Sequence, residues 1–246
     1  MAGAPAPARL RTIDLTGELE SIIRDICASV PMFAHIDMGR VLVCVASNRG
    51  IGGGGCYGKL VPLRFAGGAE IARFRGRSFA IPRVVAGERR MLYVIYFYFP
   101  RFFDLDARGK LRVIFHELYH ISPDFNGDIR RMGPVRAAHG HSRRRFDRRF
   151  EAECDGYFDR IRSTGVAEML SLDGDGLHGR FERVLGRRLR CPGRWRSDRV
   201  RICEFFYCHQ SLLGYRVLRE HRNRTCLGGC HAAQENPGSA TRRIFK

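Results

Sequence analysis

Apolar residues recur along the first part of the chain with two different periods. Over residues 14–30 they fall at helical spacing and Pro31 follows, so this segment predicts an amphipathic helix. Residues 40–47 form a β-branched apolar run, which predicts a buried strand. Residues 57–65 alternate as a strand does, and Pro62 favours an edge position because it cannot donate a ladder hydrogen bond.

The strongest strand signal is followed directly by a helix signal. Residues 91–99, MLYVIYFYF, predict a buried strand that Pro100 ends, with a short strand and a turn before it. Asp104 or Asp106 is placed to cap a helix that runs to about residue 121. The apolar run is half the length that a membrane-spanning helix needs.

The remaining segments are predicted as follows. Residues 122–142 are loop-like, and residues 143–162 predict one charged helix with aromatic residues on its buried side. Residues 171–179, SLDGDGLHG, predict another loop. We therefore expect an α+β fold with a mixed sheet: a disordered leader at 1–12, one domain at 13–188, and a basic Cys/Arg-rich extension at 189–246.

Charge and cysteine content add a partner class and a compartment. The formal net charge of +18 favours anionic partners, with nucleic acid among them. However, 40 of the 43 basic residues are arginine, which with the abundant alanine and glycine is typical of a GC-rich genome. Nine cysteines without a tight framework favour reduced thiols or metal ligands over disulfides. Because the N-terminal segment has no apolar stretch of signal-peptide length, we expect a cytoplasmic protein without membrane contact.

Candidate chemistry lies in the helix predicted to end near residue 121. The stretch VIFHELYHIS contains His116, Glu117 and His120, and such a five-residue pattern is expected by chance only about 0.02 times in this composition. Positions i and i+4 share a helix face, so both imidazoles can reach one zinc ion. Glu117 then lies where it can act as the general base toward a zinc-activated water.

A catalytic zinc site needs a third protein ligand and an open fourth position. His139 is favoured and His141 is close behind, since both lie near a junction between loop and helix. Glu151 and Glu153, on the next predicted helix, come third, and Asp128 is the remaining candidate ligand. In the intervening loop Asp128 is a candidate hydrogen-bond partner for a ligand histidine, but a loop salt bridge with a neighbouring arginine is the favoured interpretation.

The segment FHELYHISPDFNGDIRR…AHGHSRRRFD resembles a family of zinc metallopeptidases found in bacteria, archaea and phages. More distantly it resembles the SprT-like zincins, which also carry HExxH followed by a histidine near a basic helix. The resemblance is tight over residues 111–147 and loose over 40–110. It implies a zincin-like domain with zinc bound by His116, His120 and His139, and Glu117 as the base. The additional His141 departs from the family pattern.

The C-terminal segment carries a weaker metal signal. Five cysteines at spacings near those of zinc knuckles lie past residue 189, but reduced thiols are the favoured interpretation. We therefore expect a zinc-dependent peptidase that acts on a protein or peptide substrate. The alternative is a basic nucleic-acid-binding protein whose zinc site is structural or vestigial, and a third is an interaction protein built on the same scaffold.

Overall fold

The computed structural model of the chain describes residues 10–47, 56–133, 138–140, 142–189, 195–196 and 205–207. Its central sheet has the strand order β2-β8-β3, with bounds β2 Val41–Ser47, β8 Tyr93–Phe99 and β3 Gly58–Pro62. Strand β2 runs parallel to β8 and β3 runs antiparallel to it, so the sheet is mixed, as predicted. Within the described ranges β3 pairs on one side only, which confirms its predicted edge position.

Each face of the central sheet has its own hydrophobic core. Val43 and Ile95 are fully buried in the larger core, which the helices cover. Cys44 follows Val43 on β2, and Val94 precedes Ile95 on β8. Both are buried in a smaller core on the opposite face, together with Leu189. Because both faces are covered, the strands carry continuous apolar runs instead of alternating ones.

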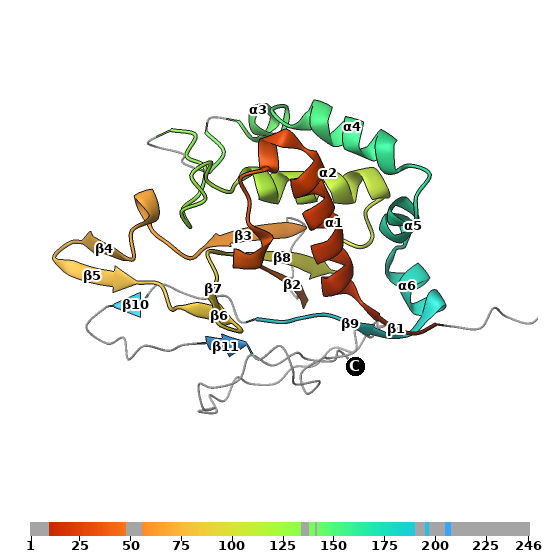
Figure 1. Cartoon of the computed structure of the whole chain (residues 1–246), viewed down its shortest axis with the longest axis horizontal. Coiled ribbons are helices and arrows are strands. Elements are labelled where there is room, and N and C mark those ends of the chain that lie inside the picture. The colour runs from red at the N-terminus through yellow and green to blue at the C-terminus, as the bar shows by residue number, and fades with distance from the viewer. Residues whose placement is uncertain are drawn as a thin grey trace, which may run out of the picture.

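Helices α1 to α4 lie on one side of the central sheet (Figure 1). Helix α1 spans Leu15–Ser29 and begins after Asp14, whose carboxylate caps its first turn. Helix α2 spans Ala107–Tyr119 and begins after Asp106, which caps it in the same way. Both helices lie where the periodicity predicts them.

The charged segment predicted as one helix forms two, and that prediction was wrong. Helix α3 spans Arg143–Asp147, and α4 spans Glu151–Ile161. Phe150, just before α4, leaves the helical conformation with φ −127° and ψ 6°. Phe146 and Phe150 are both buried, so the apolar pattern continues across the break and conceals it.

The glycine-rich segment predicted as a loop contains a helix. Helix α6 spans Gly174–Arg180 and follows α5, Gly165–Ser171. Asp173 accepts a hydrogen bond from the Gly176 N–H at 2.7 Å, which caps α6, and Leu177 is fully buried. The cap and this burial outweigh the low helix propensity of the glycines.

Two distant strands pair near the ends of the domain. Strand β1 (Leu10–Asp14) runs parallel to β9 (Phe181–Leu185), and neither was predicted. Strand β1 covers the last three residues of the predicted leader, whereas residues 1–9 lie outside the described part of the chain. The pairing therefore joins the two ends of the domain. Local sequence patterns do not predict it, because the two strands lie far apart in the sequence.

Smaller elements complete the fold. The hairpin β4–β5 extends away from the central sheet (Figure 1). The remaining strands and short helices have the bounds β4 Ile71–Phe74, β5 Arg77–Ala80, β6 Val84–Ala86, β7 Arg89–Arg90, β10 Trp195–Arg196, β11 Phe205–Tyr207, η1 Pro31–Phe33, η2 Met38–Arg40 and η3 Ala66–Gly68. None of the helices in the described ranges combines the length and apolar character that crossing a bilayer requires. The five C-terminal cysteines considered for a knuckle lie outside the described residues.

Candidate metal centre

Helix α2 carries the candidate residues into the protein interior. Its inner face packs into the larger core through Leu111, Ile114, Phe115 and Leu118, all fully buried. The last turn of the helix then places three polar side chains in the same interior, and these are only 6–7% exposed: His116, Glu117 and His120. Buried polar side chains on a core-facing helix need partners, so the neighbours of these three decide what the site can do.

Three histidines converge on one point. The Nε2 atoms of His116, His120 and His139 lie 3.1 Å from one another in all three pairs. His139 comes from a loop that folds back onto the helix, where the Arg130 N–H donates to the His120 carbonyl at 2.7 Å. The structure thus brings together the two helical histidines and the loop histidine that the sequence favoured.

The spacing of these nitrogens fits a tetrahedral metal ion. Zinc binds histidine nitrogen at about 2.0–2.1 Å, which places two tetrahedral ligand atoms about 3.3–3.4 Å apart. The observed 3.1 Å is close to this, and three ligands leave a fourth position open. Among the described residues, these three histidines form the group able to share one ion.

Asp147 fixes the orientation of one histidine ring. Its Oδ1 lies 2.6 Å from His116 Nδ1, so this nitrogen donates to the carboxylate and Nε2 is left with its lone pair. Asp147 was not among the predicted site residues. The available signal was an isolated acid within the arginine-rich SRRRFDRRF, shortly after the histidines.

The environment keeps the three imidazoles neutral. Burial lowers the pKa of His116, while Asp147 partly opposes this shift. Burial, reinforced by His116 and His139, lowers the pKa of His120 to about 3. Burial and the Arg143 guanidinium also lower the pKa of His139. Neutral imidazole is the form that binds a metal.

An aromatic wall supports the histidines. The ring of Phe146 stacks on His120 with centroids 4.6 Å apart, and it contacts His116 and His139 edge-on, each at 5.1 Å. Phe146 is 1% exposed. Tyr119, which is buried in the core, packs against the same ring. The wall excludes water from one side of the site.

Glu117 is held by the edge strand of the central sheet. Its Oε2 accepts a hydrogen bond from the Leu60 N–H of β3 at 2.7 Å. Burial raises the pKa of Glu117 to about 7, although the Leu60 N–H and the Arg143 guanidinium oppose this shift. The pattern of residues 57–65 predicted the edge strand but not its contact with Glu117.

The other candidate ligands lie elsewhere or outside the described residues. His141 is outside the part of the chain that the structure describes. Glu151 is exposed on α4 and pairs with Arg112 at 3.0 Å, and Glu153 is exposed on the same helix. Neither glutamate belongs to the group that could share an ion with the histidines.

Asp128 stabilises a loop, as the favoured interpretation predicted. Its carboxylate accepts two hydrogen bonds from Arg131, at 2.8 and 2.9 Å, and others from the N–H groups of Gly67 and Ile129. Burial alone would raise the pKa of Asp128, but these donors lower it overall. The carboxylate that hydrogen-bonds a histidine of the cluster is that of Asp147, which contacts His116.

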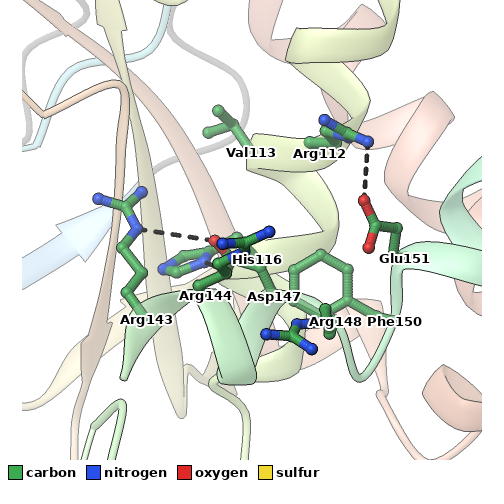
Figure 2. Close-up of a pocket in the computed structure, with 9 residues that line it drawn as sticks. All are labelled: Arg112, Val113, His116, Arg143, Arg144, Asp147, Arg148, Phe150 and Glu151. Atoms are coloured by element: carbon green, nitrogen blue, oxygen red, sulfur yellow. Dashed lines mark hydrogen bonds and ion pairs between the residues drawn. The ribbon is translucent and has the colours of Figure 1, made fainter. Parts of the chain in front are cut away.

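A cleft of about 560 Å³ opens beside His116, between α2 and α3 (Figure 2). It is lined by Arg112, Val113, His116, Arg143, Arg144, Asp147, Arg148, Phe150 and Glu151. The cleft gives the buried histidine cluster a neighbouring space large enough for part of a ligand.

Comparison with known proteins agrees with the resemblance carried by the histidine motif. One family profile matches residues 11–152, which is more than half of the 246-residue chain. No curated protein and no solved structure matches the chain. The matched range includes all three clustered histidines, Glu117 and Asp147. The chain therefore belongs to the family described as "Putative phage metallopeptidase".

Proposed function

We propose that the protein is a zinc-dependent peptidase of the zincin type. His116, His120 and His139 are the zinc ligands, and Glu117 is the general base. The observation that carries the proposal is the triangle of Nε2 atoms at 3.1 Å spacing. Family membership supports a peptidase activity and hence a protein or peptide substrate.

The chain's own residues divide the work of peptide hydrolysis. When bound, zinc supplies Lewis acidity, which polarises the scissile carbonyl and lowers the pKa of a water molecule. Glu117 takes a proton from the water while the oxygen of the water bonds to the carbonyl carbon of the substrate. It then delivers the proton to the nitrogen as the C–N bond breaks. Asp147 keeps the His116 ring oriented, and the Leu60 N–H keeps the Glu117 carboxylate in place.

We also propose that the protein is cytoplasmic. The described cysteines are all free thiols: Cys27, Cys44, Cys56 and Cys154. Cys56 is exposed, and an exposed thiol persists most readily in a reducing compartment.

The first test is the metal content of protein purified without added metal. We expect one zinc per chain in the wild type, loss of zinc in His116→Ala and His139→Ala, and retention in His141→Ala. Zinc that persists without His116 would refute the ligand assignment. Loss of zinc in His141→Ala as well would favour a closed, four-ligand structural site and the nucleic-acid-binding alternative.

A second test separates metal binding from catalysis. Glu117→Gln keeps the size of the side chain and removes its ability to accept a proton. We expect this variant to retain zinc and to hydrolyse peptides at least about 100-fold more slowly. An unchanged rate of hydrolysis would rule out Glu117 as the base.

A further inference from the structure

The cleft beside His116 is strongly basic. Four arginines line it: Arg112 from α2, and Arg143, Arg144 and Arg148 from α3 and the turn after it (Figure 2). We refer to this space as the arginine cleft. Val113 and Phe150 give it an apolar part, which can accommodate the aliphatic stem of a side chain.

Two of the four arginines are available to a ligand. Glu151 neutralises Arg112 at 3.0 Å. Arg143 also has an ion-pair partner: it lies 3.9 Å from the carboxylate of Asp147, which contacts His116 at 2.6 Å as well. Arg144 and Arg148 are exposed and have no ion-pair partner among the residues that the structure describes. Unpaired guanidinium groups at a cleft attract a carboxylate, which they bind in a bidentate geometry.

The arginine cleft lies within a few residues' reach of the proposed reaction centre. His116 belongs to both places: it lines the cleft, and its Nε2 lies 3.1 Å from the Nε2 atoms of His120 and His139. An extended peptide advances about 3.3 Å per residue. A substrate whose scissile carbonyl lies at the histidine cluster therefore brings a side chain one to three residues away into the cleft.

We propose that the arginine cleft is a specificity subsite for an acidic side chain of the peptide substrate, one to three residues from the scissile bond, with Arg144 and Arg148 binding its carboxylate. This inference rests on the proposed peptidase function. The cleft borders the proposed peptidase centre, and its volume of about 560 Å³ lies in the range of pockets that hold small groups, so a substrate side chain is the expected occupant.

Cleavage-site mapping is the direct test of this subsite. The zinc-loaded full chain is incubated with a proteome-derived peptide library, and the cut sites are read by mass spectrometry. We expect Asp and Glu to be enriched within three residues of the cut. Matched peptides with Glu or Gln at that position should differ at least tenfold in kcat/KM, mainly through KM. Cleavage without a preference for acidic residues would overturn the subsite and leave the peptidase function standing.

Charge-matched variants separate the cleft from the general basic surface. Arg144→Ala with Arg148→Ala should bring the Glu-to-Gln ratio of kcat/KM close to one. The control pair Arg145→Ala with Arg149→Ala removes the same charge from exposed positions outside the cleft lining, and should keep the ratio. An equal fall in both double variants would overturn the proposal, because long-range charge would then explain the preference.

A binding measurement tests the cleft independently of turnover. Zinc-loaded Glu117→Gln protein is titrated into fluorescein-labelled heptapeptides that differ only by central Glu or Gln residues. We expect at least tenfold tighter binding of the Glu peptide, lost in the Arg144/Arg148 double variant and kept in the control pair. If both peptides bind equally while an oligonucleotide competes only when Arg144 and Arg148 are intact, the cleft is a nucleic-acid site and the proposal fails.

Discussion

Asp147 is the side chain that fixes the orientation of the His116 ring. The Asp147→Asn variant keeps the shape of the side chain but loses the negative charge that holds His116 Nδ1–H at 2.6 Å. We expect zinc affinity to fall about 10–100-fold, as measured by competition with a metal-binding dye.

A surface aspartate provides the control for this prediction. Asp159 is exposed on α4 and pairs with Arg162 at 3.3 Å, away from the histidines. Asp159→Asn should leave zinc affinity unchanged. Equal affinity in Asp147→Asn and the wild type would show that the His116 ring is held by its packing alone.

The site residues differ in how far the sequence could identify them. His116, Glu117 and His120 follow from spacing on one helix, because i and i+4 positions share a face. His139 was one of several alternatives, since the path of the loop that carries it is not encoded in local patterns. Asp147 was missed for the same reason: its partner lies 31 residues earlier in the chain.

At the scale of elements, the contact between β3 and α2 leaves no room for a side chain at Gly58. A Cβ there would lie 2.9 Å from Val113 Cγ1 and 3.0 Å from Glu117 Cγ. Gly58→Ala should push the strand away from the helix, destabilise the protein by about 1–3 kcal/mol and slow hydrolysis while zinc is retained. Denaturant unfolding, metal content and peptide turnover measure these effects.

Two further variants make the Gly58 prediction specific. A Cβ at Gly179 of α6 would meet nothing within 4 Å beyond its own helix, so Gly179→Ala should be tolerated. Adding Val113→Ala to Gly58→Ala removes one of the two clashes and should restore part of the stability. If Gly58→Ala is as stable as Gly179→Ala, the close approach of the strand to the helix does not limit the side chain at position 58.

A buried lysine connects α2 to α5. Lys110 is 2% exposed, and its Nζ donates to the carbonyls of Leu170 and Leu172, each at 2.7 Å. Burial lowers the pKa of Lys110 to about 8, partly opposed by Asp173 and other nearby acids. Between about pH 8 and 10.5 the unfolded chain therefore binds more protons than the folded one, so the Lys110 contribution to the free energy of unfolding rises with pH.

The size of this effect is set by the difference between the two pKa values. The interval from about 8 to 10.5 corresponds to about 3 kcal/mol. Between about pH 7.5 and 10.5, the free energy of unfolding of the wild type should therefore rise by about 3 kcal/mol relative to that of Lys110→Met. Chemical denaturation at both pH values measures it. A constant difference would mean that Lys110 titrates normally in the folded protein.

Elements were predictable where one local signal dominated. Helices α1 and α2 combine a clear apolar period with a capping aspartate, and β2 and β8 are long apolar runs. Helix α6 was missed because its glycines indicate a loop, although Asp173 caps it. Strands β1 and β9 were missed because each is stabilised by the other across most of the domain.

At the scale of the whole molecule, the family match ends before the folded unit does. The profile stops at residue 152, yet Val184 of β9 is fully buried in the larger core. Val184→Asp places a carboxylate there, so we expect a loss of several kcal/mol and of zinc binding, measured by thermal unfolding and metal analysis. Arg183→Asp, at the exposed neighbouring position, should do neither. A stable, zinc-binding Val184→Asp protein would show that the site folds without β9.

The hydrogen bond from Leu60 to Glu117 gives one proton two possible acceptors. A backbone amide has a single N–H, and here it points from a sheet edge to the proposed base. A peptide strand that added to this edge and took that N–H for its own carbonyl would release the carboxylate at the moment of docking. The amide resonance of Leu60 therefore reports on this single N–H in solution, and its shift on adding a substrate peptide to the Glu117→Gln protein would show whether the docked strand takes the N–H from the side chain at position 117.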